Sequence, residues 1–137
     1  MNQHIYLRAY MAGIVVPTVF LLVVATVFTM ARYVYNIPVP VERVIVFPMA
    51  VVPNAWGLWN VLFMALRSRR QLSIGLHGAL LPILLAPLGV VVASLLNFPI
   101  PNFAAHAFPI AAPVALLVYY FAWKYLVGSL NRVLEIA

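Results

Sequence analysis

The stretch AYMAGIVVPTVFLLVVATVFTMA, Ala9 to Ala31, contains no charged residue and lies between Arg8 and Arg32. A helix crosses the hydrocarbon core of a bilayer in about 20 apolar residues, so this stretch is long enough to span a membrane. Its apolar part exceeds the core of a cleavable signal peptide, and we see no convincing small-residue cleavage site. We therefore expect this first span to stay in the protein.

Two further regions lack charge: Val44 to Leu66, and Gln71 to Trp123, which has room for two spans and a turn. Of the 137 residues, 66% are hydrophobic and 7% are charged, whereas a soluble domain carries about 25% charged residues. The chain contains no cysteine, which excludes disulfides and thiolate metal ligands. The sequence predicts an all-α integral membrane protein with four transmembrane helices, roughly Ala9–Ala31, Val44–Leu66, Leu72–Leu96 and Phe108–Leu126.

The positive charges are unevenly divided between the two sides that these spans define. One side holds the amino terminus, the turn between the second and third spans and the end of the fourth span, with Arg8, Arg67, Arg69, Arg70, Lys124 and Arg132; the other side holds Arg32 and Arg43. The positive-inside rule then places both termini in the cytoplasm, for a multi-pass protein of the inner (cytoplasmic) membrane. The net charge of +6 is thus a topology signal that also favours contact with anionic lipid heads, and no nucleic-acid groove is evident.

A sequence motif in the first outer loop recurs in the second outer loop. NIPVPVERVIVFPMA (Asn36 to Ala50) and NFPIPNFAAHAFPIA (Asn97 to Ala111) share Asn, Pro, Pro, Phe, Pro and Ala at a constant offset of 61 residues. Either a two-helix hairpin was duplicated, or both loops acquired prolines independently because helix starts favour them. We favour duplication, which gives two parallel-repeat hairpins related by an axis along the membrane normal. The expected units are residues 1–66, residues 67–126 and an amphipathic cytoplasmic tail, residues 127–137, which either extends the fourth span or bends at Gly128. An apolar stripe from the end of the fourth span into this tail consists of Leu126, Leu130, Val133 and Leu134.

Polar residues of the second and third spans form the first candidate site. Asn54, Trp56, Trp59 and Asn60 lie on the second span. His77 on the third span is expected at the same height in the membrane as Asn60. We therefore predict that these two side chains meet and that the tryptophans cover them. An Asn–His hydrogen bond between helices is ordinary interhelical contact. The alternative is a binding pocket with an apolar wall and a polar end, which a lipid or a quinone would suit. We favour the interhelical contact.

The outer loops supply a second candidate set, the charged pair Glu42 and Arg43 and the imidazole of His106. These residues either form a small polar outer site or are simply solvated, and we favour the second interpretation. His77 lies near the cytoplasmic side and His106 in an outer loop, so they cannot ligate one haem within a single chain. We expect no metal site.

The sequence carries no catalytic signature. No Ser-His-acid set, HExxH motif, phosphate-binding glycine loop or pair of carboxylates can be assembled, and the two acidic residues, Glu42 and Glu135, fall on opposite sides. We expect a non-enzymatic accessory or scaffold subunit, or a homo-oligomer, that contacts membrane lipids and binds a lipid or an apolar cofactor. The alternative is a small channel or facilitator for a neutral or weakly polar solute, in which the prolines inside the spans act as hinges instead of fixed kinks. A lipid-modifying enzyme that uses His77 is a third, weaker hypothesis.

Overall fold

The computed structural model describes residues 4–69, 72–100 and 102–136, and these ranges are helical without a strand. Outside the described residues lie Arg70 and Gln71, beside the basic turn, and Pro101, in the repeated sequence motif. The elements are α1 (Ile5–Tyr33), α2 (Val41–Val44), the π-helix η1 (Ile45–Met49), α3 (Ala50–Leu66), α4 (Ile74–Leu95), α5 (Phe103–Phe121), the π-helix η2 (Ala122–Val127) and α6 (Gly128–Val133).

Consecutive elements join into long helices. In the described part of the chain, four are long and apolar enough to cross a membrane: Ile5–Tyr33, Val41–Leu66, Ile74–Leu95 and Phe103–Val133. This confirms the prediction of an all-α protein with four apolar helices of spanning length. The first and last extend beyond the predicted spans, since the backbone stays helical past the charged residues Arg8, Arg32 and Lys124.

Helix boundaries follow from local chemistry. The α4 helix begins after Ser73, whose Oγ accepts a hydrogen bond from the backbone N–H of Leu76 at 3.3 Å, the usual contact of an N-cap. Both outer loops begin at an asparagine in the left-handed region, Asn36 and Asn97, each with φ of 53°. Asparagine adopts this conformation more readily than most residues, so it ends a helix where the chain must turn.

The two π-helices break the regular spacing of the second and fourth long helices. Pro48 lies inside η1, and a proline has no N–H to donate to a carbonyl of the preceding turn. A wider turn is one way for a helix to accommodate such a residue. The other π-helix, η2, contains no proline and changes which side chains of the C-terminal segment face the bundle.

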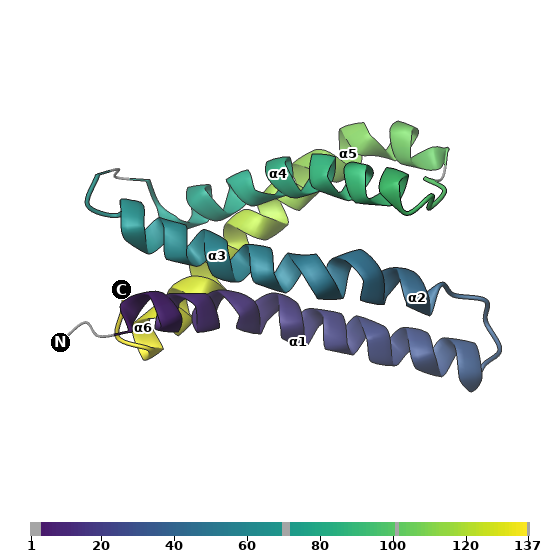
Figure 1. Ribbon diagram of the computed structural model, residues 1–137, viewed down its shortest axis with the longest axis horizontal. Helices are drawn as coiled ribbons and strands as arrows, with labels where there is room; N and C mark the ends of the chain where they lie inside the picture. The colour runs from purple at the N-terminus through teal and green to yellow at the C-terminus, as the bar shows by residue number, and fades with distance from the viewer. Residues whose placement is uncertain (1–3, 70–71, 101, 137) are drawn as a thin grey trace.

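The helices pair as two hairpins, α1 with α3 and α4 with α5. Figure 1 shows α5 crossing the bundle so that η2 and α6 reach the amino-terminal end of α1, where both chain termini lie. Two clusters of buried side chains form the core: one contains Trp56, Leu81, Leu85, Trp123 and Val127, and the other contains Ala9, Ala12 and Ile136.

Glycine permits the close approach of α1 and α3. A Cβ atom on Gly13 would lie 2.5 Å from the carbonyl oxygen of Trp56 and 2.8 Å from the Cα of Gly57. Any side chain at this position would therefore push the two backbones apart. Small residues at such crossings are typical of helix pairs in membranes.

The C-terminal tail packs on the bundle instead of bending away at Gly128, where φ is −59° and the helix continues. We predicted an apolar stripe of Leu126, Leu130, Val133 and Leu134, but the fully buried side chains are Trp123, Val127 and Asn131. Among the predicted residues, Leu130 and Leu134 are partly buried, whereas Leu126 and Val133 are exposed. The prediction assumed regular α-helical spacing, and the wider turn of η2 lies directly before this segment.

Candidate functional site

Asn60 is the centre of a buried polar contact that joins three helices. Its Nδ2 donates to the Oδ1 of Asn131 on α6 at 2.8 Å and to the carbonyl oxygen of Ala9 on α1 at 2.7 Å. The Nδ2 of Asn131 donates back to the Oδ1 of Asn60 at 3.1 Å. Both side chains are 0% exposed. A buried amide without a hydrogen-bond partner is costly, so each asparagine requires the other.

Trp59 and His77 form a second reciprocal contact, between α3 and α4. The indole Nε1 of Trp59 donates to the carbonyl oxygen of His77 at 2.7 Å, and the Nε2 of His77 lies 2.9 Å from the carbonyl oxygen of Trp59. A carbonyl oxygen only accepts, so Nε2 carries the proton in this contact. The two rings stack with centroids 4.8 Å apart.

The predicted hydrogen bond between Asn60 and His77 is wrong, because both residues bond elsewhere. The level of His77 was correctly placed, since it meets Trp59, the neighbour of Asn60. Adjacent residues on a helix point about 100° apart, so Trp59 faces α4 while Asn60 faces α1 and α6. The prediction considered only the second and third spans, whereas the partner of Asn60 comes from the far end of the chain.

Trp123 lies at the centre of the aromatic cluster. A Cβ atom on Gly78 would lie 1.9 Å from the indole Cγ of Trp123, so α4 has room for this ring only because residue 78 is glycine. The ring of Trp56 lies 5.2 Å from that of Trp123 and 5.0 Å from that of Tyr119, centroid to centroid. The buried Nε1 of Trp123 has no hydrogen-bond partner within the described residues.

Asn54 lies apart from this cluster. Its Oδ1 accepts a hydrogen bond from the hydroxyl of Tyr10 on α1, and its Nδ2 donates to the carbonyl oxygen of Ala50 at 2.8 Å. The residue is exposed on the outer surface of the bundle, in contrast to Asn60. The amide near mid-span is thus paired without belonging to a pocket with Trp59 and His77.

The three residues of the second candidate set, Glu42, Arg43 and His106, do not form one site. The carboxylate of Glu42 pairs with the guanidinium of Arg32 at the end of α1. A cavity of about 420 Å³ adjoins this ion pair and is lined by Arg32, Pro38, Val39, Pro40, Glu42 and Arg43. His106 is not part of that lining and is exposed on α5. The structure therefore brings Glu42 and Arg43 to one cavity without His106.

An apolar groove of about 940 Å³ lies between α1 and the C-terminal helix. Its lining comes from the middle of α1, from two residues of α3 and from the end of α5 through the start of α6: Val15, Val16, Pro17, Val19, Phe20, Leu21, Val23, Val52, Trp56, Val118, Tyr119, Ala122, Tyr125, Leu126, Ser129 and Leu130. Of the predicted ligand-binding residues, only Trp56 lines it. Such a volume is at the upper end of the range for small-molecule sites.

Sequence reasoning missed Asn131, Trp123 and Tyr10. The recurrence of Trp123, Val127 and Asn131 at four-residue intervals was the available signal, since residues four apart share a helix face. Tyr10 carried no comparable signal, because an aromatic residue near a membrane interface is common. Comparison with known proteins finds no family model, no curated protein and no solved structure that matches this chain.

Proposed function

We propose that this chain is a non-enzymatic, multi-pass membrane protein that works by packing, as an accessory or scaffold subunit or as a homo-oligomer. The observation that carries this proposal is that the buried asparagines and the Trp59–His77 pair use their hydrogen-bonding groups on one another. Groups paired in this way hold helices together and are not poised to act on a substrate.

The outward faces support a role in assembly. The α5 helix has no buried residue, and its large apolar side chains are exposed, including Phe108, Ile110, Val114, Leu117 and Val118. Lipid chains or partner helices would cover such a face in a membrane. The proposal is that part of this surface meets another subunit.

A channel for a neutral or weakly polar solute is the less favoured function. Such a path needs polar groups that replace water around the solute, as in known selectivity filters. The groove of about 940 Å³ offers mainly valine, leucine, alanine and aromatic side chains. Its chemistry suits an apolar chain better than a polar solute.

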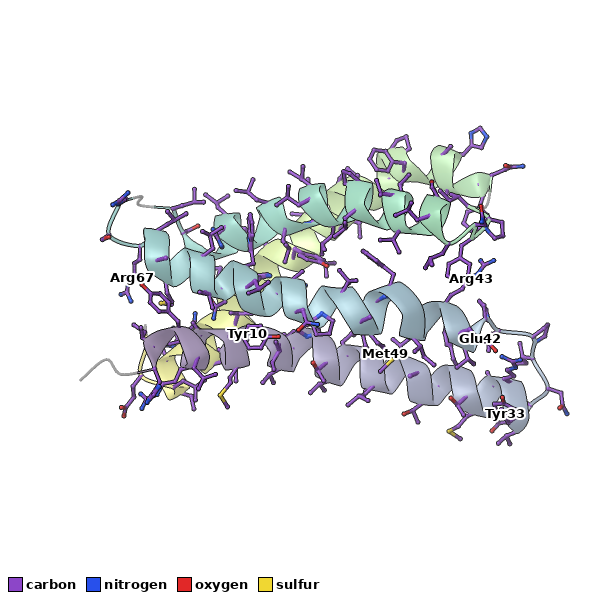
Figure 2. All side chains as sticks on the ribbon, viewed as in Figure 1. Tyr10, Tyr33, Glu42, Arg43, Met49 and Arg67 are labelled. Carbon is purple, nitrogen blue, oxygen red and sulfur yellow. The ribbon has the colours of Figure 1, made fainter. Side chains whose placement is uncertain are left out.

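The proposed location is the inner (cytoplasmic) membrane with both termini in the cytoplasm. In support, Arg67 lies at one end of the molecule and Glu42 and Arg43 at the other, as Figure 2 shows, while the termini lie at the end of Arg67. Because the chain has no cysteine, single-cysteine variants report sidedness without background. A membrane-impermeant maleimide is expected to label Asn102→Cys in intact cells and Ser68→Cys only after permeabilisation. The reverse pattern would overturn the orientation.

We also propose that the two hairpins descend from one duplicated hairpin. The shared φ of 53° at Asn36 and Asn97, 61 residues apart, supports this origin because each asparagine ends the first helix of its hairpin. Superposition of residues 5–66 on the second hairpin by rotation about the membrane normal tests it. Failure of the hairpins to superpose in this way would leave independent acquisition of the prolines as the explanation.

The scaffold role is tested by extracting the protein at native expression level in a mild detergent and measuring the intact mass of the particle. The single chain has a mass of 15.2 kDa, and the proposal expects a larger particle. A complex with other proteins would show that the chain is a subunit. If the particle is a homo-oligomer, the next experiment is to measure solute flux through that oligomer. A particle with one copy of the chain and only lipid or detergent would overturn the proposal.

A further inference from the structure

The apolar groove between α1 and the C-terminal helix is open along its length. Residues that form its walls are also exposed, with Val19 57% and Phe20 65% exposed on α1 and Leu126 52% exposed on η2. The lining residues of α1 run from Val15 to Val23, which corresponds to about 12 Å of helix. One leaflet of a bilayer has a hydrocarbon thickness of about 15 Å, half that of the core. The groove thus matches the length of one acyl chain in one leaflet.

One end of the groove is polar and positively charged. Ser129 lines the groove, and the Nη2 of Arg132 donates to the Oγ of Ser129 at 3.1 Å. The Ser129 hydroxyl itself donates to the carbonyl oxygen of Tyr125, so Ser129 positions the guanidinium of Arg132. Within the described residues, no carboxylate forms a salt bridge with Arg132.

This polar end lies at the expected level of the lipid head groups. Asn131 follows Ser129 by two residues. Asn60 donates hydrogen bonds to both Asn131 and Ala9, so these two residues lie at the same height in the bundle. Ala9 is the first residue of the uncharged stretch of α1, where the hydrocarbon core begins. Arg8 lies at the same level and donates to the carbonyl oxygen of Leu134 at 3.4 Å. A lipid that places its phosphate here has its acyl chain directed along the groove.

We infer that the groove holds an anionic glycerophospholipid, with one acyl chain against Val19 and Phe20 and its phosphate on the guanidinium of Arg132. Apolar shape alone would fit any lipid, and the unpaired cation at the head-group level selects an anionic one. The site differs from the Trp59–His77 contact, which is closed on itself. The inference depends on insertion in a membrane and is independent of the scaffold role.

Lipid selectivity is the first test. The full-length chain is purified in detergent and titrated with phosphatidylglycerol or phosphatidylcholine of identical acyl chains, and bound lipid is counted by native mass spectrometry. One cation near an anionic head group corresponds to about a five-fold difference in affinity. We expect phosphatidylglycerol to bind about five-fold or more tightly than phosphatidylcholine. Equal retention of the two lipids would overturn the inference.

Matched variants locate the head group. Arg132→Gln is expected to remove most of the preference for phosphatidylglycerol, and Ser129→Ala is expected to weaken it. Arg69→Gln is the control, because it removes the same charge at the same end of the molecule from an exposed turn outside the groove. An equal loss in Arg132→Gln and Arg69→Gln would show a general electrostatic effect and contradict a site at Arg132.

A second pair of variants locates the acyl chain. Val19→Trp places an indole in the groove and is expected to reduce binding of both lipids, whereas Val27→Trp lies on the same helix outside the lining. Both positions are exposed, so neither substitution should prevent folding. Equal binding by the two variants would overturn the placement of the chain. The mass of the natively extracted particle tests the scaffold role separately.

Discussion

The two ends of the bundle are held together by different means. At the end where the termini lie, Asn60 and Asn131 are 0% exposed and connect α1, α3 and α6. At the opposite, outer end, the exposed ion pair of Arg32 and Glu42 connects α1 to α2. The α5 helix begins at this end, as Figure 1 shows, and has no buried residue. The difference indicates that the fold is specified near the termini. The half away from the termini is left with exposed apolar side chains.

Disrupting the contact of α4 with Trp123 should have the largest effect on the bundle. Gly78→Ala places a Cβ 1.9 Å from the indole Cγ, and overpacking of this kind costs about 3 kcal/mol. The control is Gly89→Ala on the same helix, where the nearest atom lies 3.5 Å away, at ordinary contact distance. It should be neutral or stabilising, since alanine favours helix by about 1 kcal/mol over glycine. Unfolding in mixed micelles measures both, and similar values would contradict the described packing.

Removing the Trp59–His77 contact should have a smaller effect. Trp59→Phe keeps an aromatic ring and removes the N–H that donates to the carbonyl oxygen of His77 at 2.7 Å. Interhelical hydrogen bonds in membranes contribute about 0.6–1.7 kcal/mol, which is the expected loss. Tyr119→Phe removes the acceptor of the longer 3.4 Å bond from Trp56 and should cost less. A larger loss of unfolding free energy in Tyr119→Phe than in Trp59→Phe would contradict this ranking of the two contacts.

Removing the outer ion pair should have the smallest effect. Glu42→Gln removes the partner of Arg32, but the two side chains are 66% and 37% exposed, so water and salt already screen the pair. The thermal midpoint should stay within the error of the wild-type value, in low salt as well as in high salt. A clear loss of stability that disappears at high salt would show that the outer end contributes to the fold.

The spans could be predicted from sequence because a long uncharged apolar stretch has few structural alternatives in a chain this apolar. The site could be predicted only in part. Spacing around the turn between the second and third spans placed His77 level with Trp59 and Asn60, but this spacing cannot show which of two adjacent residues faces α4. The partner of Asn60 lies 71 residues away. Four-residue spacing places Asn131 on one face with Trp123 and Val127, but it does not show that this face packs on the first hairpin.

The central claim is that the buried Asn60–Asn131 pair fixes the C-terminal helix on the first hairpin. It is tested most directly by a double-mutant cycle of Asn60→Ala and Asn131→Ala, with unfolding free energies measured in mixed micelles. Each single substitution should cost about 1–2 kcal/mol, because it leaves a buried amide without its partner. The double variant should lose about 1 kcal/mol less than the sum of the two. Additive losses would show that the two residues act independently and would contradict the claim.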